Sequence, residues 1–329
     1  MFEHFSQQIA GSFPRRFLFN ALLPTFVFAS LTISLVTACL TTFTRVSAWW
    51  GALDAVTKVV ALLGYLAAIW FLAAAVSSQW RGIVRLFEGY PLRRLSVLLG
   101  WKTVPGVRWH TERMRVLLDD RDGAVPDVVS VYYRYSGEES SVFPTRLGNV
   151  LQAAENYPRD RYGVDTILFW PRLFSLLPEQ FQRDYEEYVA NYEFPLVVSF
   201  LASIATTISG MAMLLTGQPP LLYGLVVGGG FVAAYVAYRF ALSGAEELGE
   251  QQRTAFDLYR DKLLEMWPTA DDVRDERDAF NMITRFVVMG GAPGWSDSQN
   301  RHRARRDNGS RTDVGPQARD GDVTGAEGV

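Results

Sequence analysis

Charged and amide side chains gather in one stretch of the chain, from residue 143 to residue 177, between two pairs of long apolar segments. Five of them are candidates for a polar network that could bind a ligand or a partner: Arg146, Asn149, Glu155, Arg161 and Asp165. Such a network can also simply brace a domain, because structural ion pairs look like sites. The stretch contains no nucleophile–base pair and no phosphate loop, so it predicts binding and not catalysis.

Hydroxyl side chains recur at four–three–four–three spacing in the first apolar segment, which places them on one face of a continuous helix. They are Ser30, Ser34, Thr37, Thr41 and Thr44. Such a stripe can line a path for ions, or it can pack against another helix through hydroxyl hydrogen bonds. We expect packing, because no charged residue accompanies the stripe.

Small residues form a predicted packing seam on the fourth apolar segment, where they would let another span or a second protomer approach closely. They are Gly224, Gly228, Gly229, Ala233 and Ala237. The Gly228–Gly230 run is not a phosphate loop, because no Lys-Ser/Thr pair follows it and it lies in a hydrophobic segment.

The single cysteine, Cys39, excludes an intramolecular disulfide. The string Val36–Cys39 resembles a lipoprotein signal, but the apolar run is long and continues past the cysteine, so we expect a buried thiol. The three histidines are far apart and lack metal-ligand spacing. We therefore predict neither a metal site nor a cofactor.

Four apolar segments are long enough to cross a membrane as helices: 17–44, 59–76, 194–215 and 221–242. They form two hairpins, the first closed by a short connection with Trp49 and Trp50 and the second by a proline-rich turn. Arginines cluster at the ends next to both termini and the long insert, so the positive-inside bias places these parts in the cytoplasm of a bacterial cell. The partner common to all four segments is the lipid bilayer.

The whole chain divides into six segments by composition. We expect a cytoplasmic lead (1–16), hairpin 1 (17–77), an insert domain (78–193), hairpin 2 (194–242), cytoplasmic helices (243–289) and a disordered tail (290–329). Within the insert, residues 128–135 carry the β-branched and aromatic residues of a strand. A helix from Thr145 is expected to end at Pro158, and the next is expected to be interrupted at Pro171. The predicted fold class is therefore a mainly α membrane protein with a small α+β cytoplasmic insert.

The run FPTRLGNVLQAAENYP, followed by RYGVD, resembles a signature of an uncharacterised bacterial polytopic membrane family. The resemblance covers about a tenth of the chain and implies neither an activity nor a catalytic residue. A net charge of −3 excludes a strongly basic nucleic-acid-binding domain.

The sequence therefore predicts a non-enzymatic membrane scaffold or signalling component that binds cytoplasmic proteins. The alternative is an oligomeric channel or transporter with the hydroxyl stripe along its path, and a homo-oligomer is compatible with both.

Overall fold

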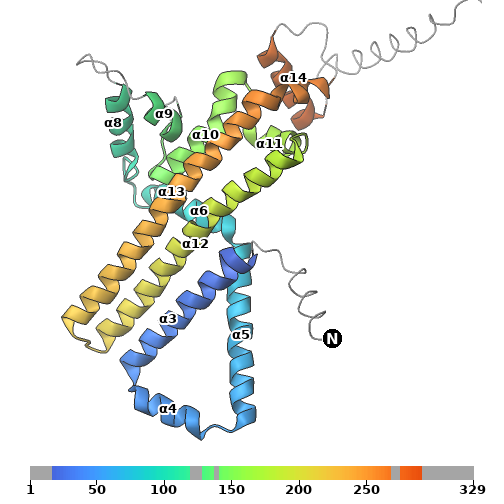
Figure 1. Cartoon of the computed structure of the whole chain (residues 1–329). Coiled ribbons are helices and arrows are strands. Elements are labelled where there is room, and N and C mark those ends of the chain that lie inside the picture. The colour runs from blue at the N-terminus through green and yellow to red at the C-terminus, as the bar shows by residue number, and fades with distance from the viewer. Residues whose placement is uncertain (1–16, 119–127, 137–140, 268–274, 291–329) are drawn as a thin grey trace, which may run out of the picture.

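The computed structural model describes residues 17–118, 128–136, 141–267 and 275–290, and in these ranges the chain forms helices and no strand. Four helices are long and apolar enough to cross a membrane. They lie in two hairpins, and a cluster of shorter helices packs at one end of them (Figure 1). The predicted lead (1–16) and almost all of the predicted tail (290–329) lie outside the described residues.

The first hairpin begins with a π-helical turn, η1 (Leu18–Leu22), which continues into α3 (Leu23–Leu40). The connection predicted around Trp49 and Trp50 contains a helix that the sequence did not predict, α4 (Phe43–Ala52), which joins α3 to α5 (Ala55–Ser78). Thr41 and Thr42 are extended between α3 and α4, and threonine is favoured at such a helix start. Asp54 caps α5 by accepting hydrogen bonds from the amides of Val56 and Thr57, at 3.0 and 3.1 Å.

The second hairpin consists of two helices that continue far beyond their apolar parts. They are α12 (Glu179–Leu215) and α13 (Pro220–Glu265), joined by a tight turn in which Gly217 has a φ of +67°. Small residues set their close approach: a Cβ on Gly230 would collide with the Thr206 side chain, and one on Gly210 would lie 2.9 Å from a Val227 methyl. The continuation of α13 beyond its span confirms that a helix follows residue 243, as predicted.

The predicted small-residue seam does not make this contact. A Cβ on Gly224, Gly228 or Gly229 would meet nothing within 4 Å, and Ala233 is exposed. Of the five predicted residues, only Ala237 is buried. The seam therefore faces away from the rest of the chain, because α12 packs against the Gly230 face of α13, and a contact with a second protomer stays a prediction.

The shorter helices and the outer parts of the second hairpin form what we call the helical module. It comprises α6 (Trp80–Glu88), α7 (Tyr90–Leu98), α8 (Val107–Leu118), α9 (Val128–Arg134), α10 (Arg146–Tyr162), α11 (Thr166–Phe174) and α14 (Glu276–Met289), with residues 179–193 and 243–265.

Three predicted details of the helical module are wrong. The expected strand at 128–135 is helix α9, because strand propensity is weak beside tertiary packing and the α9 tyrosines pack around α13. Pro158 lies inside α10, and Pro171 lies inside α11 and does not interrupt it. The insert is therefore all-helical in the described residues, and the predicted α+β character is not found.

Two large apolar cores hold the helical module, beside a smaller one around Met114, Tyr135 and Val142. One joins α5, α6, α10, α12 and α13 at the ends of the spans, with Leu147, Leu196 and Ala241 fully buried. The other lies farther out, where Phe169 of α11, Phe256 of α13 and Phe280 of α14 meet. The first core fixes the module directly to the spans.

The close contact at Gly230 predicts a difference between two neighbouring glycines. Gly230→Val should lower the free energy of unfolding by about 2 kcal/mol, because the added side chain overpacks against Thr206. The matched control, Gly228→Val, enters open space and should change it by less than about 0.5 kcal/mol. Unfolding of the detergent-solubilised variants, followed by tryptophan fluorescence, measures both; equal effects would contradict the described packing.

Candidate functional site

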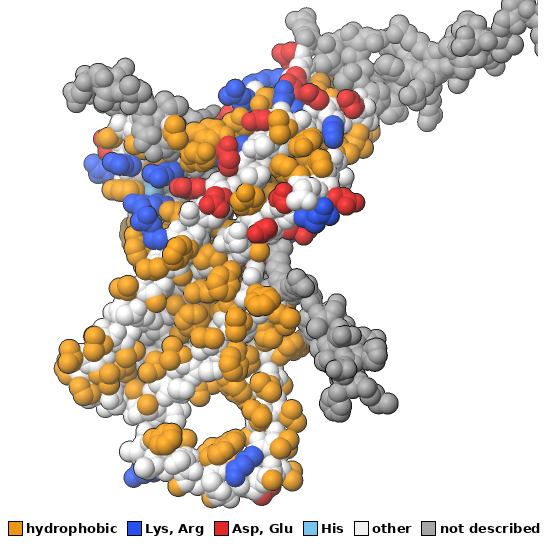
Figure 2. Space-filling model, viewed as in Figure 1, with side chains coloured by type: hydrophobic (Ala, Val, Ile, Leu, Met, Phe, Trp, Pro, Cys, Tyr) orange, Lys and Arg blue, Asp and Glu red, His pale blue; other side chains and the backbone are white. Residues whose placement is uncertain are grey.

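A cavity of about 300 Å³ lies between α8, α9, the start of α10 and α13, next to the end of the fourth apolar segment. Lysine and arginine side chains gather on this part of the surface, beside the apolar region of the spans (Figure 2). The cavity is lined by Trp109, His110, Arg113, Leu117, Arg134, Tyr135, Arg146, Asn149, Val150, Arg239, Leu242, Ser243 and Glu246.

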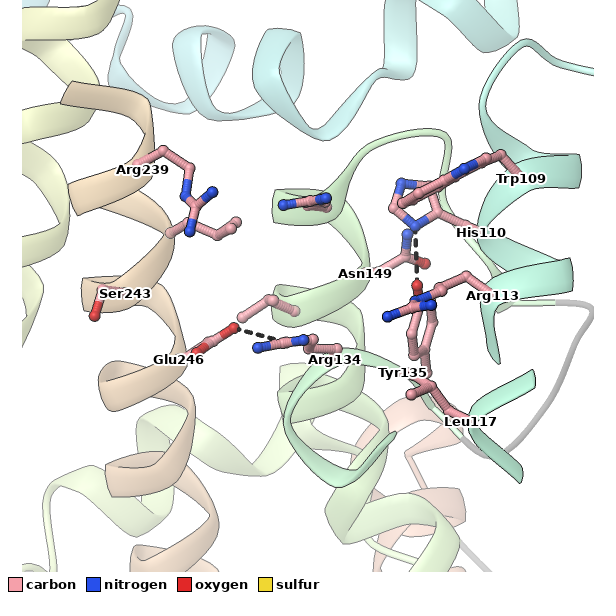
Figure 3. Close-up of a pocket in the computed structure, with 13 residues that line it drawn as sticks. Trp109, His110, Arg113, Leu117, Arg134, Tyr135, Asn149, Arg239, Ser243 and Glu246 are labelled. Atoms are coloured by element: carbon pink, nitrogen blue, oxygen red, sulfur yellow. Dashed lines mark hydrogen bonds and ion pairs between the residues drawn. The ribbon is translucent and has the colours of Figure 1, made fainter. Parts of the chain in front are cut away.

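Two helices supply opposite walls of the cavity. Trp109, His110, Arg113 and Leu117 come from α8, and they face Arg239, Ser243 and Glu246 of α13 across the gap (Figure 3). On each helix three lining residues recur at three- or four-residue spacing, at 110, 113 and 117 on α8 and at 239, 243 and 246 on α13, so one face of each helix carries them.

The third wall is the start of α10. Thr145 caps this helix by accepting a hydrogen bond from the Gly148 amide at 3.1 Å, and Arg146 is its first residue. The Asn149 side chain bonds both backbone groups of Phe143, accepting from its amide at 2.7 Å and donating to its carbonyl at 2.9 Å. Asn149 therefore fixes the entry to α10, and the partial positive charge of the helix start adds to that of Arg146.

Positive charge exceeds negative charge in the described lining of the cavity. Its one carboxylate, Glu246, pairs with Arg134 at 3.3 Å. Three further arginines line the cavity: Arg113, Arg146 and Arg239. Their side chains are solvent-exposed, and Arg146 lies over the Trp109 ring with 5.7 Å between its guanidinium carbon and the ring centroid. The arrangement suits an anion, because guanidinium groups bind carboxylate and phosphate oxygens in pairs.

His110 closes the inner end of the cavity as a neutral side chain. It is 4% exposed, and its Nδ1 atom forms a hydrogen bond with the Tyr135 hydroxyl at 3.1 Å. Burial and then the nearby Arg146 lower the pKa of His110 to about 4. Its imidazole therefore adds no charge at neutral pH, and the charge of the cavity comes from the arginines.

Arg253 of α13 holds α9, and with it the Arg134 and Tyr135 wall of the cavity. Its side chain is 1% exposed; it donates to the Tyr132 carbonyl at 3.0 Å, with its guanidinium carbon 4.4 Å from the Tyr132 ring centroid. Desolvation of an arginine is expensive, and cation–π contacts with desolvated rings offset part of that penalty. Burial raises the pKa of Tyr132 to about 12, so this ring stays neutral beside the arginine.

The five residues predicted as one polar network lie in two places. Arg146 and Asn149 line the cavity. At the far end of α10, Asp165 caps α11 through the Leu168 amide and pairs with Arg159 at 2.6 Å. Burial, then the nearby Asp165, raises the pKa of Glu155. Arg161 is exposed, and its carbonyl accepts a hydrogen bond from Arg277 of α14 at 3.4 Å. The contacts of Glu155, Arg161 and Asp165 brace α10 against α11 and α14, away from the cavity.

The predicted hydroxyl stripe is shorter than expected. Helix α3 ends at Leu40, so Thr41 is extended and Thr44 belongs to α4. Ser30 forms a hydrogen bond with Tyr65 of α5 at 2.5 Å, which is a packing role. Ser34 and Thr37 remain on α3, Ser34 exposed and Thr37 half-buried. The stripe residue Ser30 thus joins α3 to α5, the two long helices of the first hairpin.

Within the described ranges, no group of three His, Cys, Asp or Glu side chains is placed to hold a metal ion. Cys39 is a free, half-buried cysteine near the end of α3. Of the histidines, His4 and His302 lie outside the described residues.

Most of the cavity was missed from the sequence. The sequence does contain a helical pattern for each of two walls. His110, Arg113 and Leu117 share one helical face, and Arg239, Ser243 and Glu246 share another. Nothing in the spacing shows that these two faces, more than 120 residues apart along the chain, lie opposite each other. Comparisons of the chain with protein-family models, curated proteins and solved structures found no match.

The lowered pKa of His110 predicts an acid-sensitive fold. Between pH 6.5, the ordinary pKa of histidine, and about 4, the unfolded chain binds a proton at His110 that the folded chain does not. Acidification from pH 7 to pH 5 should therefore lower the free energy of unfolding by about 1–2 kcal/mol through this residue. The His110→Gln variant should lack this loss of unfolding free energy on acidification. Urea titrations of both proteins at pH 7 and pH 5 measure it. Identical pH profiles for the two proteins would refute the assignment to His110.

Proposed function

We propose that this chain is a plasma-membrane scaffold or signalling component, without enzymatic activity, that binds an acidic group of a cytoplasmic partner protein in the arginine-lined cavity. The observation that carries the proposal is the excess of arginine there. Arg113, Arg146 and Arg239 line the cavity together, and the one described carboxylate of its wall already pairs with Arg134.

The chemistry of the lining selects the ligand class. Each guanidinium presents a planar fork of donors that matches a carboxylate or a phosphate, and the Trp109 and Leu242 side chains add apolar surface beside the charge. A volume of about 300 Å³ is at the lower limit of ligand pockets, so the cavity suits a single acidic side chain rather than a nucleotide cofactor.

The cytoplasmic placement is also part of the proposal. Arg81 and Arg85 follow the second span, and Arg239, at the end of the fourth, lines the cavity together with Arg113 and Arg146. Membrane proteins retain such arginine-rich segments on the cytoplasmic side, which supports a cytoplasmic partner.

A fluorescein-labelled octaglutamate peptide and inorganic phosphate serve as probes of the cavity in detergent-solubilised protein. Fluorescence anisotropy should show salt-sensitive binding of the peptide, weakened at least tenfold by Arg113→Gln with Arg146→Gln, because each charged hydrogen bond contributes about 1.5–3 kcal/mol. Arg183→Gln is the control, since Arg183 is exposed on α12 and its carboxylate partner is Glu179 of the same helix.

Three outcomes would overturn the proposal in different ways. Absence of binding by both probes would remove the anion site itself. Binding that is indifferent to the double substitution would place the site elsewhere. Binding of phosphate without the peptide would indicate a receptor for a small anion and not a scaffold for a protein partner.

A further inference from the structure

A second surface, separate from the cavity, combines exposed apolar side chains with positive charge. It consists of α7 (Tyr90–Leu98) and the turn that follows it to Trp101. From Gly89 to Thr111 the sequence contains no acidic residue, but it contains Arg93, Arg94, Lys102 and Arg108. Such a composition is typical of a short amphipathic element that lies on a membrane surface.

The apolar side chains of this surface are not covered by the described part of the chain. Val97 and Leu98 are each 81% exposed, Leu99 is 55% exposed and Trp101 is 46% exposed. Four neighbouring large apolar side chains in water would be unfavourable by roughly 1 kcal/mol or more each, compared with an apolar environment. A covering surface is therefore needed.

Contacts at its first turn fix α7 to the helical module. Gly89 links α6 to α7 at a φ of +89°, and a Cβ at this position would collide with the Pro144 side chain. Arg93 donates to the Val142 carbonyl at 3.0 Å, and its guanidinium carbon lies 4.1 Å from the Phe143 ring centroid. The base of α7 is thus held, and its apolar end projects.

The adjoining helix α6 places α7 at the ends of the spans. Ile83 of α6 belongs to the core that contains Val76 of α5 and Leu242 of α13, the last apolar residues of the second and fourth spans. Phe87 stacks on Tyr238 of α13, with ring centroids 5.8 Å apart. Because α7 begins two residues after α6 ends, its exposed apolar end lies beside the boundary between the spans and the helical module.

We propose that α7 and the turn through Trp101 insert into the headgroup region of an anionic lipid leaflet, the one from which the helical module emerges. Val97, Leu98, Leu99 and Trp101 enter the boundary of the acyl chains, and Arg94 and Lys102 bind lipid phosphates. Charge complementarity favours this occupant, since the segment is basic and free of acidic residues. The segment leads directly into α8, so its insertion also seats the α8 wall of the cavity.

The single cysteine makes a direct test simple. In a Cys39→Ser background, a nitroxide spin label at Leu98→Cys reports the depth of α7 in lipid nanodiscs through its relative accessibility to oxygen and to a water-soluble nickel chelate. The control label at Val116→Cys lies on α8, where the side chain is 56% exposed. In nanodiscs that contain phosphatidylglycerol, the label at 98 should be several-fold more accessible to oxygen than to nickel, and the label at 116 should show the reverse.

The charge requirement has its own comparison. Arg94→Gln with Lys102→Gln should reduce the inserted population of the label at 98 about tenfold or more, because each basic residue near an anionic surface contributes a factor of about five. Neutral phosphatidylcholine nanodiscs should have the same effect on the unsubstituted segment. Both residues are exposed on the surface of the segment, so their substitution should leave the fold intact.

Three results would overturn the inference. A label at 98 that is as accessible to nickel as the label at 116 would show that α7 stays in water. Insertion that is equal in neutral lipid and in the double variant would remove the anionic lipid from the proposal. Dipolar broadening between labels at 98 would show that a second copy of the chain covers this surface instead.

Discussion

The structure depends on the close pairing of α12 and α13, which are single helices through both the apolar spans and the helical module. Gly210 and Gly230 let the two backbones approach within the spans, and Gly244 does the same farther out, where a Cβ would lie 3.1 Å from the Asn191 carbonyl oxygen. Close packing of small residues replaces the hydrophobic effect as the attraction between helices in lipid. Since one pair of helices serves both environments, the position of the module relative to the membrane follows from this pairing.

The cavity is a consequence of that arrangement. The α13 helix emerges from its span with Arg239 and Glu246 on one face, and the starts of α8 and α10 approach this face from the side. The buried Arg253, two turns beyond Glu246, ties α9 to the same helix through the Tyr132 carbonyl. Positive charge is thus held by rigid elements at the ends of the apolar spans.

The sequence predicted the parts of the fold that depend on local composition. Length and hydropathy indicated all four apolar helices, because a run of about twenty apolar residues has few alternatives. The valines and tyrosines of the α9 segment favour a strand locally, whereas its helix is stabilised by distant partners such as Arg253 and His110. Helix α4 is not predicted from the sequence, because the ten residues after Thr42 carry no strong helical signal of their own.

The candidate site was only partly predictable. Arg146 and Asn149 were identified because they lie in the densest polar stretch, and Glu155, Arg161 and Asp165 were grouped with them by proximity in sequence. Helix α10 carries Arg146 and Asn149 at its start, whereas Glu155 and Arg161 follow six or more positions later, so the two groups lie at different levels along the helix. The arginines that complete the site come from α8, α9 and α13, and only tertiary packing brings them to α10.

The continuity of α12 and α13 across the membrane boundary is the central claim, and amide hydrogen exchange in lipid nanodiscs tests it most directly. Peptides that cover residues 188–197 of α12 and 243–250 of α13 contain the two crossings. Slow exchange is expected throughout both peptides, except at Pro195, which has no amide hydrogen, because every other backbone donor there lies within an unbroken helix. Rapid exchange in either segment, between protected flanks, would show a hinge and contradict a module held rigidly on its spans.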